Sequence, residues 1–591
     1  MWDVPLSLPL HFYFSFMKTL CRPLSSKSSL VSTDCLIRIG RCPEWLRFVG
    51  DPDSMPSSYL TLLQNLYCES VSFDFRFHSL LPSTVVQHHL REVLYVANDP
   101  ACRNREILRL YLLELCEEDA ALALSLFFFC HLNWSQEAQA DNRLFLQKLR
   151  TLCLPRVQRL RTSHTLTTDS SLVDTLVQYS TSFFSTLFSL SAFLFTSPLP
   201  QRQTLLTDQC NTINHMTLEP MGGLWLPLGA GMLITQIHAD SCKTFSTKSR
   251  CPCLMEFEVK GAKHSAALYK RVKRKHFLDA PSVLPQPSFW AWLCSWFCLA
   301  PQPSVDVEPF PSLPEAADSV IVVEKPRANR FRVMVKTHEA MRQEEMAAHL
   351  IDEIRSILEA EKVSAILRCY EVTAMTEHDG IIEYLDGFLS IHELKKHLQA
   401  QGFSSLDEYV FSTFQGKPRA LQRFRRNLIY SLAAFSIVCY VLQIKDRNDG
   451  NILLDKHGVL VHIDFGFMLS NCPGNIHFET APFKLTPDMM HLVGQPGSSG
   501  FFLFQSVCTA VFEAICAHQH QLLAIVRLYS TLFPSLPCFS NNVQQTIQLL
   551  EERLNPWQPA GEHVKMLIQQ SIGSWRTHWY DKFQFYITGI L

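Results

Sequence analysis

An asparagine and an aspartate flank a predicted β-hairpin in the second half of the chain. Asn451 opens the apolar run 451–455, Asp464 follows the apolar run 459–463, and residues 456–458 form a turn that ends in Gly. Two apolar runs around such a turn predict a β-hairpin. If residue 455 faces residue 459, the ends of the hairpin meet, and the carboxamide of Asn451 lies beside the carboxylate of Asp464. Two such oxygen ligands suit Mg²⁺, which keeps its other positions for water and phosphate groups.

The residues before this hairpin indicate phosphoryl transfer from ATP. An Asp-Arg pair stands at 446–447, Asn451 follows it, and Asp464 begins the tripeptide Asp-Phe-Gly. This combination holds metal and nucleotide in kinases, so we expect ATP as co-substrate and Mg²⁺ as the metal, with Mn²⁺ as a substitute. An ordinary hairpin with a chance Asp-Phe-Gly is the alternative. Protein kinases place His and Arg before the catalytic Asp; because Asp446 here precedes Arg447, the loop resembles the lipid-kinase form.

Three longer segments extend the pattern around this loop. They are KDRNDGNILLD at 445–455, HIDFGFMLSNCPG at 462–474 and FETAPFKLT at 478–486. Together they resemble type III phosphatidylinositol 4-kinases of the beta class, and weaker similarity reaches 225–259 and 575–591. The resemblance implies an α+β fold with a two-lobed, protein-kinase-like catalytic domain preceded by an all-α accessory helical domain. It also implies a lipid kinase that phosphorylates the 4-hydroxyl of phosphatidylinositol.

The first half of the catalytic domain supplies the predicted nucleotide-binding residues. Lys336 ends the β-rich run 331–336, where a fixed ammonium can bind the α- and β-phosphates of ATP. A helical pattern follows at 341–358, and the resemblance makes Glu344 the partner of Lys336, with Glu345 as second choice. The alternative is a surface helix with acids in its first turn. The resemblance further implies hinge residues whose backbone binds adenine, Glu383 and Leu385, and the first residues of the activation segment, Phe465 and Gly466.

The catalytic loop departs from the family pattern at two positions. The resemblance places a His-Asn pair where this chain has Asn448 and Asp449, and that His is the expected acceptor of the inositol hydroxyl proton. A carboxamide cannot perform this proton transfer. Three alternatives remain: Asp446 or Asp449 is the base, the enzyme is slow, or the chain is a pseudokinase that binds ATP and partners. Arg447 is expected to brace the loop. We favour activity because the lysine and both metal ligands are retained.

The activation segment favours a particular class of lipid. No Lys or Arg occurs between residues 467 and 481, and Lys484 is the nearest cation beyond that range. A kinase that accepts an already phosphorylated inositol ring needs Lys or Arg to neutralise the extra phosphates. The sequence therefore favours unphosphorylated phosphatidylinositol. A protein substrate is disfavoured because Ala-Pro-Phe at 481–483 replaces the Ala-Pro-Glu of protein kinases.

Changes in composition divide the chain into segments. Residues 83–160 have helical apolar spacing, residues 163–185 are rich in Ser and Thr, and eight prolines fall between 279 and 314. We expect an uncertain N-terminal segment at 1–40, an accessory helical domain at 41–165, a connector at 166–205, the first N-lobe strands at 206–278, a Pro/Trp-rich insertion at 279–316, the rest of the N-lobe with the hinge at 317–386, and the C-lobe with a C-terminal helix at 387–591.

Charge and cysteine content indicate which partners and which cellular compartment to expect. The 591-residue chain carries 53 basic and 55 acidic residues, so no nucleic-acid partner is expected. Its twenty cysteines lack regular metal-ligand spacing and are expected to be reduced thiols of a cytoplasmic protein. Residues 176–195 carry no formal charge, and we favour a buried or interfacial helix there over a membrane span.

Two segments are candidates for membrane contact. The basic run 270–275 precedes three tryptophans within 289–297, and such a combination suits anionic lipid headgroups. A solvated charge run with a small satellite core is the alternative. The C-terminal helix at 575–591 is expected to touch membrane or to pack on the C-lobe. The resemblance implies peripheral association with Golgi-type membranes through small GTPases or adaptors.

Overall fold

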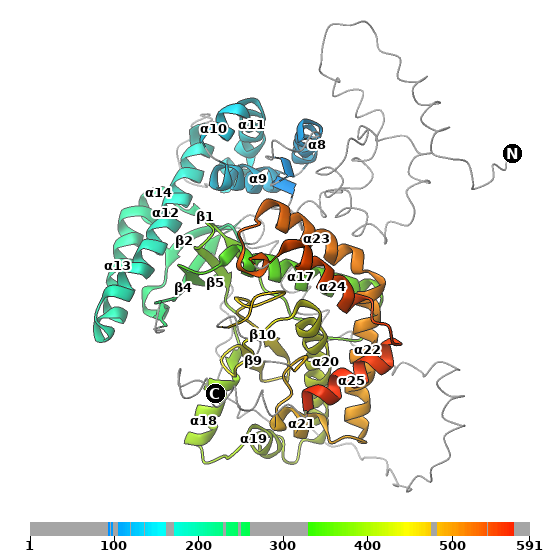
Figure 1. The fold of residues 1–591 in the computed structure, drawn as a ribbon. Coiled ribbons are helices and arrows are strands. Elements are labelled where there is room, and N and C mark those ends of the chain that lie inside the picture. Colours follow the sequence, from blue (N-terminus) through cyan, green and yellow to red (C-terminus); the bar gives the residue numbers. More distant parts are fainter. Residues whose placement is uncertain are drawn as a thin grey trace, which may run out of the picture.

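The structure, a computed structural model, describes residues 93–94, 96–97, 105–118, 120–134, 136–160, 171–228, 232–245, 250–260, 329–473, 481–540 and 542–572. Within these residues, a group of N-terminal helices precedes a lobe built on a curled antiparallel sheet and a second, mainly helical lobe (Figure 1). The predicted α+β, two-lobed fold with a helical N-terminal region is therefore confirmed.

The described N-terminal helices pack together because one of them is apolar on every side. They are α8 (Arg105–Glu118), α9 (Ala120–Asn133), α10 (Gln136–Asp141) and α11 (Arg143–Leu160). α9 contains three consecutive phenylalanines, of which Phe127 and Phe128 are fully buried. A helix that is apolar all round must be covered by its neighbours, and α8 and α11 lie against α9.

A 26-residue helix, α12 (Ser171–Thr196), occupies most of the predicted connector. It contains residues 176–195, where we favoured a buried or interfacial helix. Its hydroxyls are satisfied locally; Ser180 Oγ, for example, donates to the carbonyl four residues earlier. Such bonds allow Ser and Thr within a helix. Ser180 Oγ also accepts a hydrogen bond from the backbone N–H of Trp225, and Ser191 Oγ donates to Cys251 O at 2.9 Å. These contacts fasten α12 to the sheet of the first lobe.

The first lobe contains a seven-stranded sheet. Two further helices precede it, α13 (Arg202–Ile213) and α14 (Glu219–Met221), joined by a π-helical turn at Asn214–Leu218. The strands are β1 (Leu224–Trp225), β2 (Leu233–Ile237), β3 (Lys243–Thr244), β4 (Cys253–Lys260), β5 (Arg330–Lys336), β6 (Val372–Ala374) and β7 (Gly380–Glu383). Their order is β1-β2-β4-β5-β7-β6, with β3 beside β4, and all pairs are antiparallel. Helix α17 (Met341–Ala360) packs against β6 and places its first turn at the end of β5.

The second lobe is organised around the long buried helix α20 (Pro418–Leu442), which leads into the catalytic loop. The other helices are α18 (Ile391–Ala400), α19 (Leu406–Thr413), α21 (Pro487–Val493), α22 (Ser499–Ala517), α23 (Gln519–Leu532), α24 (Val543–Leu554) and α25 (Ala560–Ile572). Both α22 and β10 lie against α20. The hairpin strands β9 and β10 are contacted by helices of this lobe, β9 by α18 and β10 by α20 (Figure 1).

The predicted hairpin is present with the predicted register. β9 (Ile452–Asp455) pairs with β10 (Leu460–His462), Leu453 faces Val461, and β8 (Phe388–Ser390) extends the sheet on the other side of β9. The turn requires glycine at Gly458, where φ is +86° and a Cβ atom would lie 2.3 Å from a backbone oxygen of α20. This local geometry explains why the short apolar runs fold as they do.

One described helix, α22, is long and apolar enough to cross a membrane by length and composition alone, although core helices of other proteins pass the same test. The uncharged stretch at 176–195 does not meet that criterion. Several predictions fall outside the described residues: the N-terminal segment 1–40, the basic run 270–275, the insertion 279–316 and the C-terminal helix at 575–591.

Candidate active site

Two carboxylates hold the ammonium of Lys336 at the end of β5. Lys336 Nζ lies 3.2 Å from Glu344 Oε2 and 3.2 Å from Glu339 Oε2. The Glu344 contact is the pairing expected from the sequence, and its geometry is present. Glu339 was not predicted. Its Oε1 also forms an ion pair with Arg250 Nη1 at 2.8 Å. Arg250 precedes β4, so the lysine, both acids and this arginine converge from three elements.

Opposite charges at this position shift the pKa values of Lys336 and Asp464 toward their charged forms. Burial alone lowers the pKa of Lys336, but the carboxylates of Glu344, Glu339 and Asp464 raise it well above its ordinary value. Burial also raises the pKa of Asp464, yet the positive charges of Lys336 and Arg447 hold it below its usual range. For Glu344, burial outweighs the ammonium and raises the pKa to about 7. A charged lysine therefore stands beside an ionised Asp464.

Arg447 braces the backbone that carries Asp464. Its side chain is almost fully buried; Nη1 donates to Ile463 O at 2.7 Å, Nη2 donates to Asp464 O, and Nε donates to Lys445 O at 3.0 Å. The guanidinium also lies 5.9 Å from the ring centroid of Phe465. A planar fork of donors suits several carbonyls at once, so Arg447 has the geometry of the bracing role that the sequence predicted.

Asp446 and Asp464 both adopt left-handed backbone conformations, with φ of +58° and +61°. Such conformations cost energy for residues other than Gly and often occur at functional positions. The side chain of Asn448 supports the turn at Asp446: its Oδ1 accepts the Gly450 N–H at 2.8 Å, and its Nδ2 donates to Asp446 Oδ1 at 3.3 Å. The residue that replaces the family's His thus holds the carboxylate of Asp446.

Asp449 forms a buried ion-pair cluster. Its Oδ2 lies 2.8 Å from Lys395 Nζ and its Oδ1 lies 3.1 Å from Lys484 Nζ, and the side chains of Asp449 and Lys484 are each 4% exposed. Burial raises the pKa of Asp449, but the two lysines lower it below its ordinary value. A carboxylate neutralised in this way is a poor proton acceptor. These ion pairs disfavour Asp449 as the base, a role that stays a prediction, and Lys484 is buried against a carboxylate.

The predicted metal ligands have suitable chemistry for Mg²⁺. Asn451 Nδ2 donates to Asp446 O at 2.8 Å, which leaves the side-chain oxygen of Asn451 as its ligand atom. Asp464 is ionised, and its Oδ1 accepts only a long bond from Gly466 N–H at 3.3 Å among the contacts in the described residues. One carboxylate and one amide oxygen fit a hard cation that keeps several other ligands. Their role as metal ligands stays a prediction.

The predicted hinge residues lie at the end of β7, which includes Glu383, and just after it. The Glu383 N–H donates to Glu371 O at 2.8 Å, and its carboxylate pairs with Arg368 at 2.9 Å. Tyr384 N–H donates to Arg332 O at 3.0 Å, and Leu385 O accepts the Phe388 N–H at 3.4 Å. The N–H of Glu383 is therefore already used within the sheet. Adenine binding by Glu383 or Leu385 stays a prediction.

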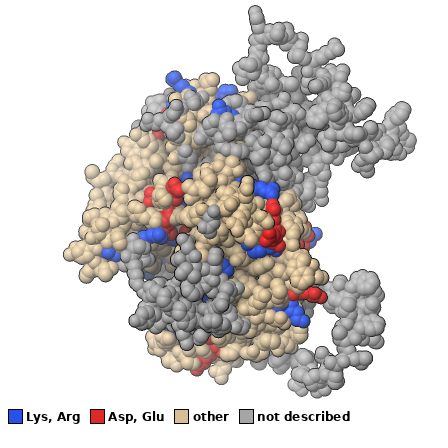
Figure 2. Space-filling model, viewed as in Figure 1, with Lys and Arg blue, Asp and Glu red and all other residues tan. Residues whose placement is uncertain are grey.

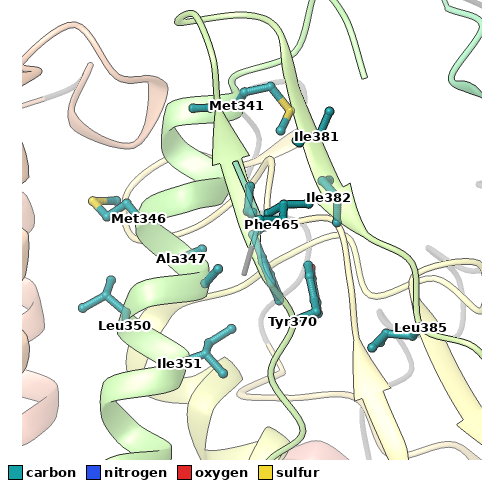
Figure 3. Close-up of a cluster of buried hydrophobic side chains, with 14 of the residues drawn as sticks. Met341, Met346, Ala347, Leu350, Ile351, Tyr370, Ile381, Ile382, Leu385 and Phe465 are labelled. Atoms are coloured by element: carbon teal, nitrogen blue, oxygen red, sulfur yellow. The ribbon is translucent and has the colours of Figure 1, made fainter. Parts of the chain in front are cut away.

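Phe465 anchors the Asp-Phe-Gly turn in the core. Its ring lies parallel to that of Tyr370, with centroids 6.1 Å apart and an interplanar angle of 11°. Figure 3 shows both rings between α17, which presents Ala347 and Ile351, and the strand that carries Ile382. Burial raises the pKa of Tyr370 well above its usual value, so this phenol stays neutral. The stacking fixes the residue next to Asp464.

Sequence reasoning missed several residues of the site. Glu339 stands three residues after Lys336, and an acid so near a predicted phosphate-binding lysine was a usable signal. Gln343 is fully buried and donates to backbone oxygens of the Asp-Phe-Gly segment; its position next to Glu344 was the only signal. Nothing in the sequence indicated Tyr370 or the approach of Arg250, because both reach the site through the tertiary fold.

Comparisons with known proteins agree with this geometry. Residues 330–538 match the family model described as phosphatidylinositol 3- and 4-kinase. The chain is 39% identical over 274 residues to a phosphatidylinositol 4-kinase of Dictyostelium discoideum, which covers 45% of this chain and 22% of that protein. It is 34% identical over 267 residues to phosphatidylinositol 4-kinase beta 1 of Arabidopsis thaliana, covering 44% of this chain and 23% of the relative.

A vertebrate relative gives a similar result. Phosphatidylinositol 4-kinase beta of Xenopus tropicalis is 34% identical over 270 residues, which is 45% of this chain and 33% of that protein. The match thus spans a third or less of the length of these relatives. Residues 330–538, where the lysine, the predicted catalytic loop and the hairpin lie, are therefore similar to the domain of the phosphatidylinositol 3- and 4-kinase family.

Proposed function

We propose that this chain transfers the γ-phosphoryl group of ATP to the 4-hydroxyl of phosphatidylinositol. The observation that carries the proposal is the charged Lys336, held by Glu344 and Glu339 beside an ionised Asp464. Relatives that share this domain are named phosphatidylinositol 4-kinases. The choice of the 4-hydroxyl rests on those names, whereas phosphoryl transfer rests on the residues.

The chain's own residues have distinct tasks in this reaction. Lys336 binds phosphate oxygens of ATP, and its two carboxylate partners keep the ammonium in place. Asn451 and Asp464 would hold Mg²⁺, which neutralises charge on the phosphates as they are transferred. Arg447 fixes the carbonyls around Asp464, so the ligand carboxylate keeps a single position.

Asp446 is the proton acceptor that the geometry favours. It lies at the start of the catalytic loop, and its Oδ1 accepts a hydrogen bond from the neutral amide of Asn448 at 3.3 Å. Asp449, the other candidate, is held between two lysines. In a loose transition state the base contributes less than positioning and electrostatics, so a carboxylate in place of the family's His is compatible with turnover.

The charge arrangement favours an acceptor lipid without phosphates on its ring. The segment 467–481 contains no Lys or Arg, and Lys484 is neutralised by Asp449. An additional ring phosphate would lack a cation from this segment. On the described part of the face shown in Figure 2, basic and acidic side chains lie in small groups of both signs.

A pseudokinase is the second candidate function. It is favoured by one observation: Asn448, at the position of the family's His, cannot accept a proton. Such a protein would bind ATP through Lys336 and would use its helical region to bind partners. The two functions differ in turnover and not in nucleotide binding.

Transfer of labelled phosphate from ATP to phosphatidylinositol vesicles tests the proposal. We expect labelled phosphatidylinositol 4-phosphate from the natural chain with Mg²⁺, and none from Asp464→Ala. Deacylation and chromatography of the product identify the hydroxyl that carries the label. Label at another hydroxyl, or label that persists in Asp464→Ala, would contradict the proposed reaction.

Location and partners are proposals that rest on the resemblance. We infer peripheral association with the cytosolic face of Golgi-type membranes, and small GTPases or adaptors as partners. A fluorescent fusion tests the first point, since it should overlap a Golgi marker. A uniform cytoplasmic signal, or one on another organelle, would exclude it.

A further inference from the structure

Gln343 lies at the meeting point of three segments that are far apart in the sequence. It is the third residue of α17, next to Glu344, and its side chain is completely buried. A buried primary amide is costly unless its donors and acceptor are all paired. Gln343 meets this requirement through contacts to the segment after Asp464 and to a 3₁₀ turn of the second lobe.

The donors of Gln343 bind the metal-binding turn. Its Nε2 donates to Phe465 O at 3.0 Å and to Gly466 O at 2.8 Å. Arg447 donates to the two carbonyls immediately before these, at Ile463 and Asp464. Four consecutive carbonyls, 463 to 466, are therefore held from two sides, by the catalytic loop and by the helix that carries the partner of the phosphate-binding lysine.

The acceptor of Gln343 ties this arrangement to the second lobe. Its Oε1 accepts the Cys538 N–H at 2.9 Å, in the 3₁₀ turn Pro537–Phe539. Ser470 Oγ, from the activation segment, donates to Cys538 O at 2.5 Å. The backbone of Cys538 thus links α17 and the activation segment. The amide of Gln343 cannot shift without breaking its contact to Cys538 or its contacts to Phe465 and Gly466.

We propose that Gln343 is a positioning residue that sets the orientation of Asp464 and so determines affinity for the divalent cation. The inference rests on the proposed function, because it concerns the same metal site. Residue Asp464 has a left-handed backbone, which persists only where its surroundings hold it. Arg447 fixes that backbone up to the carbonyl of Asp464, and Gln343 fixes the two peptide groups that follow. Without Gln343, the carboxylate would sample orientations that do not bind metal.

The test compares Gln343→Met, which keeps the side-chain length but loses all three hydrogen bonds, with Ser470→Ala as matched control. Ser470→Ala removes the other contact to Cys538 and leaves the donors of Gln343 in place. Binding of a fluorescent ATP analogue is titrated with Mg²⁺, without lipid, so the measurement does not depend on turnover. We expect the half-saturating Mg²⁺ concentration to rise about tenfold in Gln343→Met, because the two hydrogen bonds to the carbonyls of Phe465 and Gly466 are lost.

Three further measurements separate positioning from general damage to the fold. Binding of the analogue without Mg²⁺ and the KM for phosphatidylinositol should not change in Gln343→Met, and hydrogen exchange should rise in residues 464–468. Ser470→Ala should lower the Tm while its Mg²⁺ dependence stays that of the natural chain. Unchanged Mg²⁺ dependence in Gln343→Met, or an equal shift in both variants, would overturn the inference. If the natural chain binds the analogue but transfers no phosphate, the proposed function fails, and the Mg²⁺ titration still decides the role of Gln343.

Discussion

Replacing Asp449 by Asn should destabilise the second lobe, because the carboxylate neutralises two lysines in a buried setting. Removing one partner of a buried ion pair costs about 3 to 5 kcal/mol. The lower end applies here, since Asn keeps one oxygen acceptor and Lys395 is 27% exposed, with Asp488 3.7 Å away. Lys484 bears most of the loss because its side chain is 4% exposed.

A change of about 3 kcal/mol is large enough to measure as a shift in melting temperature. For a folding unit of roughly 200 residues, each kcal/mol corresponds to about 2 to 4 °C, so Asp449→Asn should lower the Tm by about 6 to 12 °C. Lys484→Met alone should also destabilise the protein, because Asp449 then remains buried with one lysine fewer.

The double variant Asp449→Asn, Lys484→Met provides the control. It removes both charges of the most buried pair, so its Tm should lie well above the value expected from adding the two single effects. Differential scanning fluorimetry of the four proteins gives this comparison. An unchanged Tm in Asp449→Asn, or strictly additive effects in the double variant, would refute the assignment of Asp449 as the centre of a buried charge cluster.

Other predictions follow from single sites. Gly458→Ala places a Cβ 2.3 Å from Phe424 O at a φ of +86°. The substitution should lower the free energy of unfolding by about 2 kcal/mol or more, as measured by urea denaturation. An unaltered denaturation midpoint would contradict the turn geometry. Arg447→Lys should lower the rate of phosphate transfer about 100-fold, because an ammonium cannot replace the fork that holds two carbonyls; a normal rate would exclude the bracing role. Burial raises the pKa of Asp455 to about 6, so its folded-state carboxyl binds a proton more tightly than the unfolded one, and its contribution to stability is lost as pH rises from about 4 to about 6. Asp455→Asn should therefore become more stable relative to the natural chain over that range, by about 3 kcal/mol, and parallel pH profiles of the two proteins would disprove this.

Local spacing was enough to predict the hairpin. The register from 451 to 463 depends on a short turn and alternating side chains. The pairing of Lys336 with Glu344 came from the family resemblance; the two residues are eight apart, so a strand end and a helix start bring them together.

Features that depend on long-range contacts were not predictable in the same way. Asp449 is separated from Lys395 by 54 residues and from Lys484 by 35, and this separation hid the pairing that disfavours Asp449 as a base. Gln343 contacts Cys538 across 195 residues. The helix expected at 176–195 is part of α12, but its contacts were not predictable: Ser and Thr have modest helix propensity, and the bonds from their hydroxyls to earlier carbonyls appear only once the helix exists.

The central claim is that the chain is an active lipid kinase whose proton acceptor is Asp446 rather than an imidazole. The most direct measurement is the initial rate of phosphate transfer to phosphatidylinositol by the natural chain, by Asp446→Asn and by Asn448→His. We predict measurable transfer by the natural chain and a loss of about 100- to 10,000-fold in Asp446→Asn, the usual range for a general base. No transfer by the natural chain, with transfer restored in Asn448→His, would contradict the claim and identify a pseudokinase silenced at Asn448.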